Sequence, residues 1–166
     1  MRKKIIFILI FSVAFAFVEA SVVYYLRIIF GIDSNFVPST NYREVINLGF
    51  IAFLAPKSLV LPDQLITHVE SLRELSTIVM LVSISLLAGK NLKTRIAAFL
   101  ISFATWDLFY YVFLYALAGW PTSLFDIDVY FLDPVVWVGP VITPLVIDSI
   151  LLVTGIWMFL GKEKKK

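Results

Sequence analysis

Four long apolar runs dominate the chain, and shorter polar connections separate them. Each run reaches the roughly 20 residues that a helix needs to cross a lipid bilayer. We therefore predict four transmembrane helices at residues 5–30, 66–89, 96–119 and 135–160. The sequence lacks the short alternating segments that are typical of a membrane β-barrel, and no internal repeat is evident in it. The predicted fold class is an all-α integral membrane bundle, with residues 1–166 in a single domain.

The basic residues indicate how the bundle is oriented. Most of the 14 Lys and Arg residues lie near the N-terminus, in the connection between the second and third runs, and at the C-terminus. These are Arg2, Lys3, Lys4, Lys90, Lys93, Arg95, Lys162, Lys164, Lys165 and Lys166. Four spans bring all three places to one side, so the positive-inside rule predicts that both termini are cytoplasmic. We expect a multi-pass protein of the cytoplasmic (inner) membrane, and no nucleic-acid site in its basic tail.

The first apolar run has a second interpretation. Arg2, Lys3 and Lys4, the run itself and then Val18-Glu19-Ala20 resemble a signal peptide with its cleavage site. Apolar residues continue from Ser21 to Phe30, however, and give the run a full spanning length. We therefore expect an uncleaved helix.

The other two connections carry a different pattern. The first, residues 31–65, contains an apolar segment at 45–55 that is too short to span and is expected at the membrane interface. The second, residues 120–134, is rich in aromatic residues. Trp120, Tyr130 and Trp137 fit the aromatic belt at the level of the lipid headgroups.

Composition agrees with a membrane protein. Hydrophobic residues make up 60% of the chain and charged residues 16%, against about 25% charged in soluble domains. This excludes an ordinary soluble domain and a disordered chain. The sequence has no cysteine, which excludes a disulfide scaffold and metal sites that need thiolate ligands.

Each predicted helix carries a carboxylate inside its apolar run. The five acids are Glu19, Glu70, Glu74, Asp107 and Asp148. At a rise of 1.5 Å per residue, all but Glu70 lie about 17–21 Å from the cytoplasmic helix ends, in one layer of the bundle. An ionised carboxylate that faces lipid costs at least about 2.5–3.5 kcal/mol at the helix centre. We therefore expect all five to point into the bundle.

Few positive charges are available to this acid layer. Arg27 and Arg73 are the predicted charge partners, which leaves an excess of acids that protons, a metal ion or another subunit must compensate. Tyr110 and Tyr111 follow Asp107 by about one helical turn and are the predicted hydrogen-bond donors. Pro140 and Pro144 precede Asp148 and are expected to kink the fourth helix.

A metal site is a weaker alternative. Glu74, Asp107 and Asp148 are the candidate ligands, and their oxygens would suit a hard cation such as Ca²⁺ or Mg²⁺. The single histidine, His68, precedes Glu70 with the wrong spacing for the Glu-x-x-His motif of di-metal bundles, and we expect it near the outer surface. No other cofactor is predicted.

Several short strings occur together in this chain. They are Glu19-Ala20 with Val22–Arg27, Arg73-Glu74 with Thr77–Leu81, Trp106–Tyr111, Trp120-Pro121 with Ser123-Leu124, and Pro134 with Trp137–Val141. Together they resemble an uncharacterised family of small prokaryotic four-helix integral membrane proteins. The resemblance covers most of the chain except the first outer connection, which is longer here. It implies the four-helix architecture and no particular activity.

The functional expectation is a membrane protein whose buried carboxylate–arginine–tyrosine cluster binds or relays protons or a small cation. The same acids could instead fix helix register through ion pairs, or meet a partner as part of an accessory subunit or assembly factor. A third alternative is a membrane enzyme that uses them as metal ligands or acid–base groups on an amphiphilic substrate. The expected partners are the lipid bilayer and either a second copy or a larger membrane complex.

Overall fold

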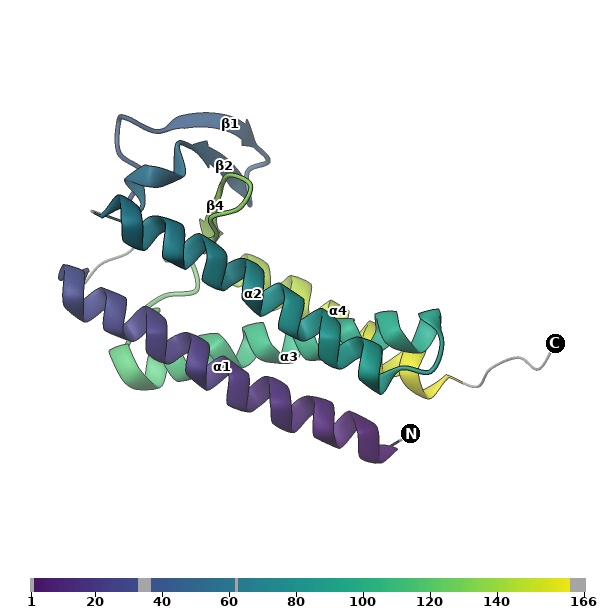
Figure 1. The fold of residues 1–166 in the computed structure, drawn as a ribbon. Coiled ribbons are helices and arrows are strands. Elements are labelled where there is room, and N and C mark those ends of the chain that lie inside the picture. The colour runs from purple at the N-terminus through teal and green to yellow at the C-terminus, as the bar shows by residue number, and fades with distance from the viewer. Residues whose placement is uncertain (1, 33–36, 62, 162–166) are drawn as a thin grey trace. The chain divides into compact units, whose positions relative to one another are not determined.

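The computed structural model of this chain describes residues 2–32, 37–61 and 63–161, without the side chains of Arg2 and Leu59. The helices are α1 (Arg2–Phe30), the short 3₁₀ helix η1 (Lys57–Leu59), α2 (Gln64–Ala88), α3 (Leu92–Ala118) and α4 (Ile142–Leu160) (Figure 1). The strands are β1 (Arg43–Asn47), β2 (Ala52–Ala55), β3 (Ile127–Phe131) and β4 (Val136–Pro140). Residues 33–36 of the first connection and the basic tail from Lys162 to Lys166 lie outside the described residues.

The four long helices agree with the prediction of four spans. Each is long and apolar enough to cross a membrane. Their ends have local causes in the sequence. Asp63 caps α2 by accepting the Ile66 N–H at 2.8 Å, and Asn91 caps α3 by accepting the Thr94 N–H at 2.9 Å. Gly119 follows α3 with a φ of +66°, the left-handed conformation that commonly ends a helix.

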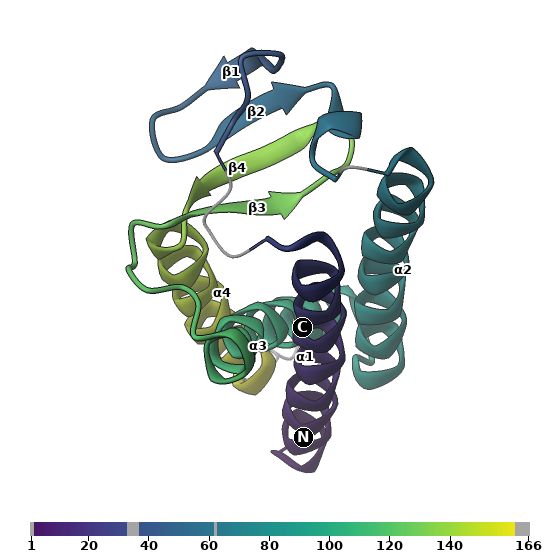
Figure 2. The same ribbon diagram turned by 90° about the vertical axis from the view of Figure 1, so that its left-hand side faces the viewer.

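A four-stranded antiparallel sheet corrects the predicted all-α fold class. Its strand order is β1-β2-β4-β3, which Figure 2 shows from the side. The apolar segment 45–55 folds into most of a β-hairpin, and the aromatic connection 120–134 contains β3. The predicted fourth helix begins at Ile142, because residues 136–140 form β4.

The composition of β4 explains this difference. Val136, Trp137 and Val138 are β-branched or aromatic, which favours a strand, and Gly139-Pro140 ends it. A short apolar run read by hydrophobicity alone does not distinguish a strand from the start of a helix. Pro144 consequently lies in the first turn of α4, where an N–H has no partner in the helix. Pro140 lies in β4, so neither proline removes a hydrogen bond from the interior of α4, and the cause of the kink predicted beside Asp148 is absent.

The sheet has one apolar face and one aromatic face. Leu54, Leu132, Val136 and Val138 form a buried cluster with neighbours that include Tyr42 and Val60. On the opposite face the Trp137 ring packs edge-on against Phe53 at 4.9 Å and against Phe131 at 6.2 Å between centroids. Trp137 and Tyr130, which the sequence assigns to a headgroup belt, therefore contact other parts of the protein.

The order of elements repeats although the sequence shows no repeat. Helix, β-hairpin, helix occurs first as α1-β1-β2-α2 and again as α3-β3-β4-α4. The two central strands pair antiparallel about Phe53 and Trp137, and β1 and β3 form the two edges, so the sheet is approximately two-fold symmetric. The number of residues between Phe53 and Trp137 is the same as the number between Arg43 and Ile127, which are the first residues of β1 and β3.

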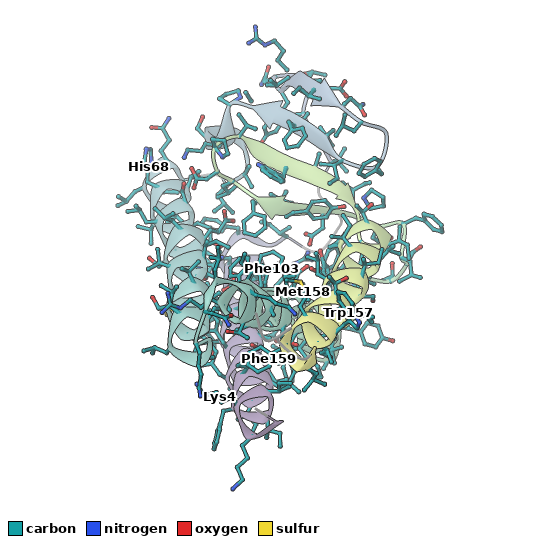
Figure 3. All side chains as sticks on the ribbon, turned by 90° about the vertical axis from the view of Figure 1, so that its right-hand side faces the viewer. Lys4, His68, Phe103, Trp157, Met158 and Phe159 are labelled. Atoms are coloured by element: carbon teal, nitrogen blue, oxygen red, sulfur yellow. The ribbon has the colours of Figure 1, made fainter. Side chains whose placement is uncertain are left out.

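The chain divides into two compact units. The first consists of Met1–Ala20, Val79–Phe113 and Pro144–Lys166, and the second of Ser21–Ile78 and Leu114–Thr143. The second unit contains the whole sheet. The first has its own apolar core, made of Ile8, Ala97, Ala98, Ile101 and Phe159. Figure 3 labels Phe159 together with its neighbour Trp157, which is exposed on the other side of α4.

Candidate functional site

The structure places the predicted site residues in two groups. The first unit contains Glu19, Asp107, Tyr110, Tyr111 and Asp148, and the second contains Arg27, Glu70, Arg73 and Glu74. The sequence predicts one acid layer shared by all four helices. Each unit has its own internal contacts and its own set of acids.

Three acids from three helices act on one another in the first unit. The carboxyl groups of Asp107 on α3 and Asp148 on α4 lie close enough together to interact directly. Glu19 on α1 is close enough to Asp107 for their charges to interact. Asp148 is only 2% exposed and Glu19 is buried, whereas Asp107 is half-buried. Three chain segments that are distant in the sequence therefore place acids together inside helices that could span a membrane.

The carboxyl–carboxyl contact has a chemical requirement. An ionised carboxylate only accepts hydrogen bonds, so two such groups can bond to each other only when one of them carries a proton. Two ionised carboxylates at this separation in a medium of low dielectric would also repel strongly. A proton shared between Asp107 and Asp148 would remove this repulsion.

Several buried polar atoms of the first unit have no hydrogen-bond partner among the described residues. They are Asp148 Oδ1, Ser12 Oγ, Thr105 Oγ1 and Trp106 Nε1. A buried polar atom without a partner costs about 1–3 kcal/mol, and such atoms commonly bind a buried water. Asp148 Oδ1 is thus an acceptor that remains available after the contact with Asp107 is made.

An apolar layer lies next to the acids on one side. Ile8 precedes Glu19 on α1, Ile101 precedes Asp107 on α3, and Phe159 follows Asp148 on α4. These three side chains are almost completely buried and belong to one apolar cluster. The acids are therefore separated by packed apolar side chains from the end of the first unit where α1 begins and α4 ends.

The two tyrosines pack against each other directly after Asp107. Their rings are in edge-to-face contact with centroids 5.0 Å apart, and Tyr111 is buried. Both lie about one helical turn from Asp107. Their role as hydrogen-bond donors to the acids stays a prediction.

In the second unit Arg73 pairs with Glu70 on the same face of α2. The guanidinium donates through Nε to Glu70 Oε2 at 2.9 Å and through Nη2 to Oε1 at 2.5 Å. This two-point contact between residues three apart is the strong geometry for an arginine–carboxylate pair. The Glu70 carboxylate is therefore paired with a positive charge from its own helix.

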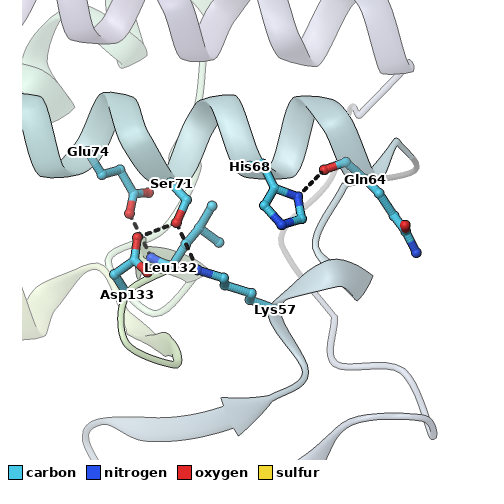
Figure 4. A network of polar contacts seen from close by, with 7 residues as sticks. All are labelled: Lys57, Gln64, His68, Ser71, Glu74, Leu132 and Asp133. Atoms are coloured by element: carbon cyan, nitrogen blue, oxygen red, sulfur yellow. Dashed lines mark hydrogen bonds and ion pairs between the residues drawn. The ribbon is translucent and has the colours of Figure 1, made fainter.

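Glu74 binds a backbone group of the sheet. Its Oε2 accepts the N–H of Leu132, in the turn between β3 and β4, at 2.8 Å (Figure 4). The carboxylate thereby supplies an acceptor to a donor that the sheet does not pair. This geometry favours a structural role for Glu74.

A polar cluster that the sequence did not indicate lies next to Glu74. Lys57 Nζ donates to Asp133 Oδ1 at 2.8 Å and to Ser71 Oγ at 2.9 Å, and Ser71 Oγ donates to Asp133 Oδ2 (Figure 4). The hydrogen bonds from Lys57 and then from Ser71 lower the pKa of Asp133 below its usual range. The only signal in the sequence is that Lys57 is one of few basic residues in the outer connections.

Arg27 has an aromatic partner. Its guanidinium lies over the Trp120 ring, 4.2 Å from the centroid, and Trp120 is buried. A cation over an indole face is stabilised by the ring quadrupole. The predicted charge partner Arg27 and the predicted belt residue Trp120 thus contact each other.

The candidate metal ligands Glu74, Asp107 and Asp148 come from both units. Within residues 2–32, 37–61 and 63–161, no three His, Asp or Glu side chains are placed to hold a metal ion. His68 is exposed on α2, and its Nδ1 donates to the carbonyl of Gln64 at 2.8 Å (Figure 4).

Comparison of the chain with protein-family models, with curated proteins and with solved structures gives no match.

Proposed function

We propose that this protein is an ion-linked membrane protein whose Asp107–Asp148 pair, with Glu19 beside it, binds and releases protons. The observation that carries the proposal is the close approach of acids from three helices, with Asp148 and Glu19 buried and Asp107 close to both. A proton bound between Asp107 and Asp148 would be shared by the two carboxyl groups, and its loss would leave two repelling charges. The pair therefore links protonation to the packing of α3 against α4.

The repeated architecture supports this proposal. Glu19 precedes Gly31 by the same number of residues as Asp107 precedes Gly119, and both glycines follow the ends of their helices with positive φ. The two acids thus occupy equivalent positions in the two helix–hairpin–helix repeats. Many membrane transporters are built from such repeats and bind their ions near the middle of the bilayer.

The setting that we propose is the cytoplasmic membrane, with both termini in the cytoplasm. The support is the distribution of Lys and Arg, which favours that side for Lys3, Lys4 and Lys90. In this orientation the apolar layer around Ile101 lies between the acids and the cytoplasm.

Infrared spectroscopy of the purified protein in lipid vesicles tests the proposal directly. A protonated carboxyl group has a carbonyl stretch that an ionised one lacks. We expect such a band at neutral pH, and we expect it to disappear in Asp107→Asn and in Asp148→Asn, since each variant removes one partner. Ser149→Ala is the matched control, because Ser149 follows Asp148 but is exposed on α4 and bonds only the Leu145 carbonyl of its own helix.

Proton movement is measured in the same vesicles with a trapped pH-sensitive dye. Uptake that follows an imposed pH gradient and is lost in both aspartate variants, but not in Ser149→Ala, supports a transport-like role. If the wild-type protein shows no protonated-carboxyl band between pH 5 and pH 8, the pair holds no proton and the proposal is wrong.

A further inference from the structure

Among the exposed apolar side chains of the second unit, four lie in two turns whose backbone bonds the beginning of α4. Leu48 and Phe50 lie in the turn between β1 and β2, and Leu124 and Phe125 lie shortly before β3. Their exposed fractions are 55%, 53%, 49% and 75%, respectively. We call these four residues the apolar collar.

Hydrogen bonds attach both parts of the collar to the beginning of α4. Thr143 Oγ1 donates to the carbonyl oxygen of Phe50 at 3.1 Å. The Ile142 N–H donates to the carbonyl oxygen of Leu124 at 2.8 Å. Gly139 permits the close approach, because a Cβ atom there would lie 2.6 Å from the Phe50 carbonyl oxygen. The collar is therefore fixed at the level of the first turn of α4.

The length of α4 determines where that first turn lies in a bilayer. The helix has 19 residues. At 1.5 Å per residue it is about 29 Å long, which only just equals the hydrocarbon thickness of about 30 Å. Strand β4 directly precedes it, so the helix cannot be extended at this end. If α4 spans the membrane, its first turn must stand at the edge of the hydrocarbon layer.

We propose that the apolar collar inserts into the lipid leaflet in which α4 begins. Residues 48–51 and 122–125 carry no charged side chain that insertion would desolvate. Val146 and Ile150, which follow the first turn of α4, are also apolar and are 50% and 60% exposed. The occupant of this surface is thus the acyl-chain boundary of the bilayer, and the sheet is partly immersed at its α4 end.

The experiment uses spin labels on single cysteines in the full chain, reconstituted into phosphatidylcholine vesicles. Because the chain has no cysteine, each variant carries one label. Phe50→Cys and Phe125→Cys place labels in the collar. Arg43→Cys is the matched control, because it is exposed at the far end of the same hairpin, opposite Ala55.

Collisions with oxygen, which concentrates in lipid, are compared with collisions with a water-soluble nickel chelate. We expect labels at positions 50 and 125 to collide mainly with oxygen and the label at position 43 mainly with nickel. Equal nickel accessibility at all three positions would overturn the proposal, since the collar would then be in water. Shielding from both reagents at 50 and 125 would also overturn it, because protein would then cover the collar. Leu48→Cys and Leu124→Cys give the same test if either phenylalanine variant fails to fold.

Discussion

Asp133 is held by donors from two distant parts of the chain, Lys57 and Ser71. Because these bonds lower its pKa, the ionised carboxylate stabilises the folded state. That stabilisation is complete above the usual aspartate pKa of about 3.9 and is lost as the pH falls through the lower pKa of the folded protein.

The Asp133→Asn variant should therefore be less stable than the wild type at neutral pH. Both Lys57 and Asp133 are more than one-third exposed, so we expect a loss under about 1 kcal/mol. The difference should shrink as the pH is lowered below about 4. Thermal unfolding in detergent, followed by circular dichroism from pH 7 to pH 3, measures it. A difference that is constant over this range would contradict the assigned ion pair.

The burial of the acids could be predicted from the sequence, but their hydrogen-bond partners could not. Burial of Glu19 and Asp148 in apolar helices could be predicted, because a charge that faces lipid is costly. The partners could not be predicted from helix positions alone. Glu74 binds the N–H of Leu132, and this contact depends on a turn whose existence the apolar pattern did not indicate.

At the scale of elements, the hydrophobic pattern predicts the long helices well and the strands poorly. A run such as Leu92–Ala118 is long enough that only a spanning helix fits it. Val136–Pro140 is short, and its hydrophobicity merges with that of α4. The β-branched residues and the Gly139-Pro140 pair were the usable signals for a strand, and they are weaker than the apolar run itself.

Glu74 joins two elements, and its removal should loosen one of them. In Glu74→Ala the N–H of Leu132 loses its acceptor, and we expect a destabilisation of about 1.5–3 kcal/mol, as for bonds to charged groups. Hydrogen exchange at the Leu132 amide should become faster. Glu74→Gln keeps an acceptor oxygen and should lose less. Ser76→Ala on the exposed face of α2 is the control, and equal exchange in all three variants would exclude the contact.

At the scale of the whole molecule, the pairing of β2 with β4 constrains the topology. These strands come from the two connections that follow α1 and α3, so both connections must lie on one side of a membrane. That requirement agrees with four spans, which a count of apolar runs alone had predicted.

Cysteine labelling checks this topology in intact cells. Ser39→Cys and Ser123→Cys, both exposed and in the two paired connections, should react with a membrane-impermeant maleimide from the same side. Lys90→Cys, between α2 and α3, should react only after the membrane is opened or inverted. Labelling of positions 39 and 123 from opposite sides would be incompatible with the sheet.

Because each hairpin binds a helix of the other half, the chain should still assemble when it is cut into two fragments. The first hairpin is hydrogen-bonded to α4 through Phe50 and Thr143, and the second hairpin is hydrogen-bonded to α2 through Leu132 and Glu74. Each half of the polypeptide therefore binds a helix of the other half. A cut at Asn91, between α2 and α3, would leave both of these hydrogen bonds and the pairing of β2 with β4 intact. Two separately translated fragments, each with two helices and one hairpin, should therefore find each other in the membrane and co-purify as a complex.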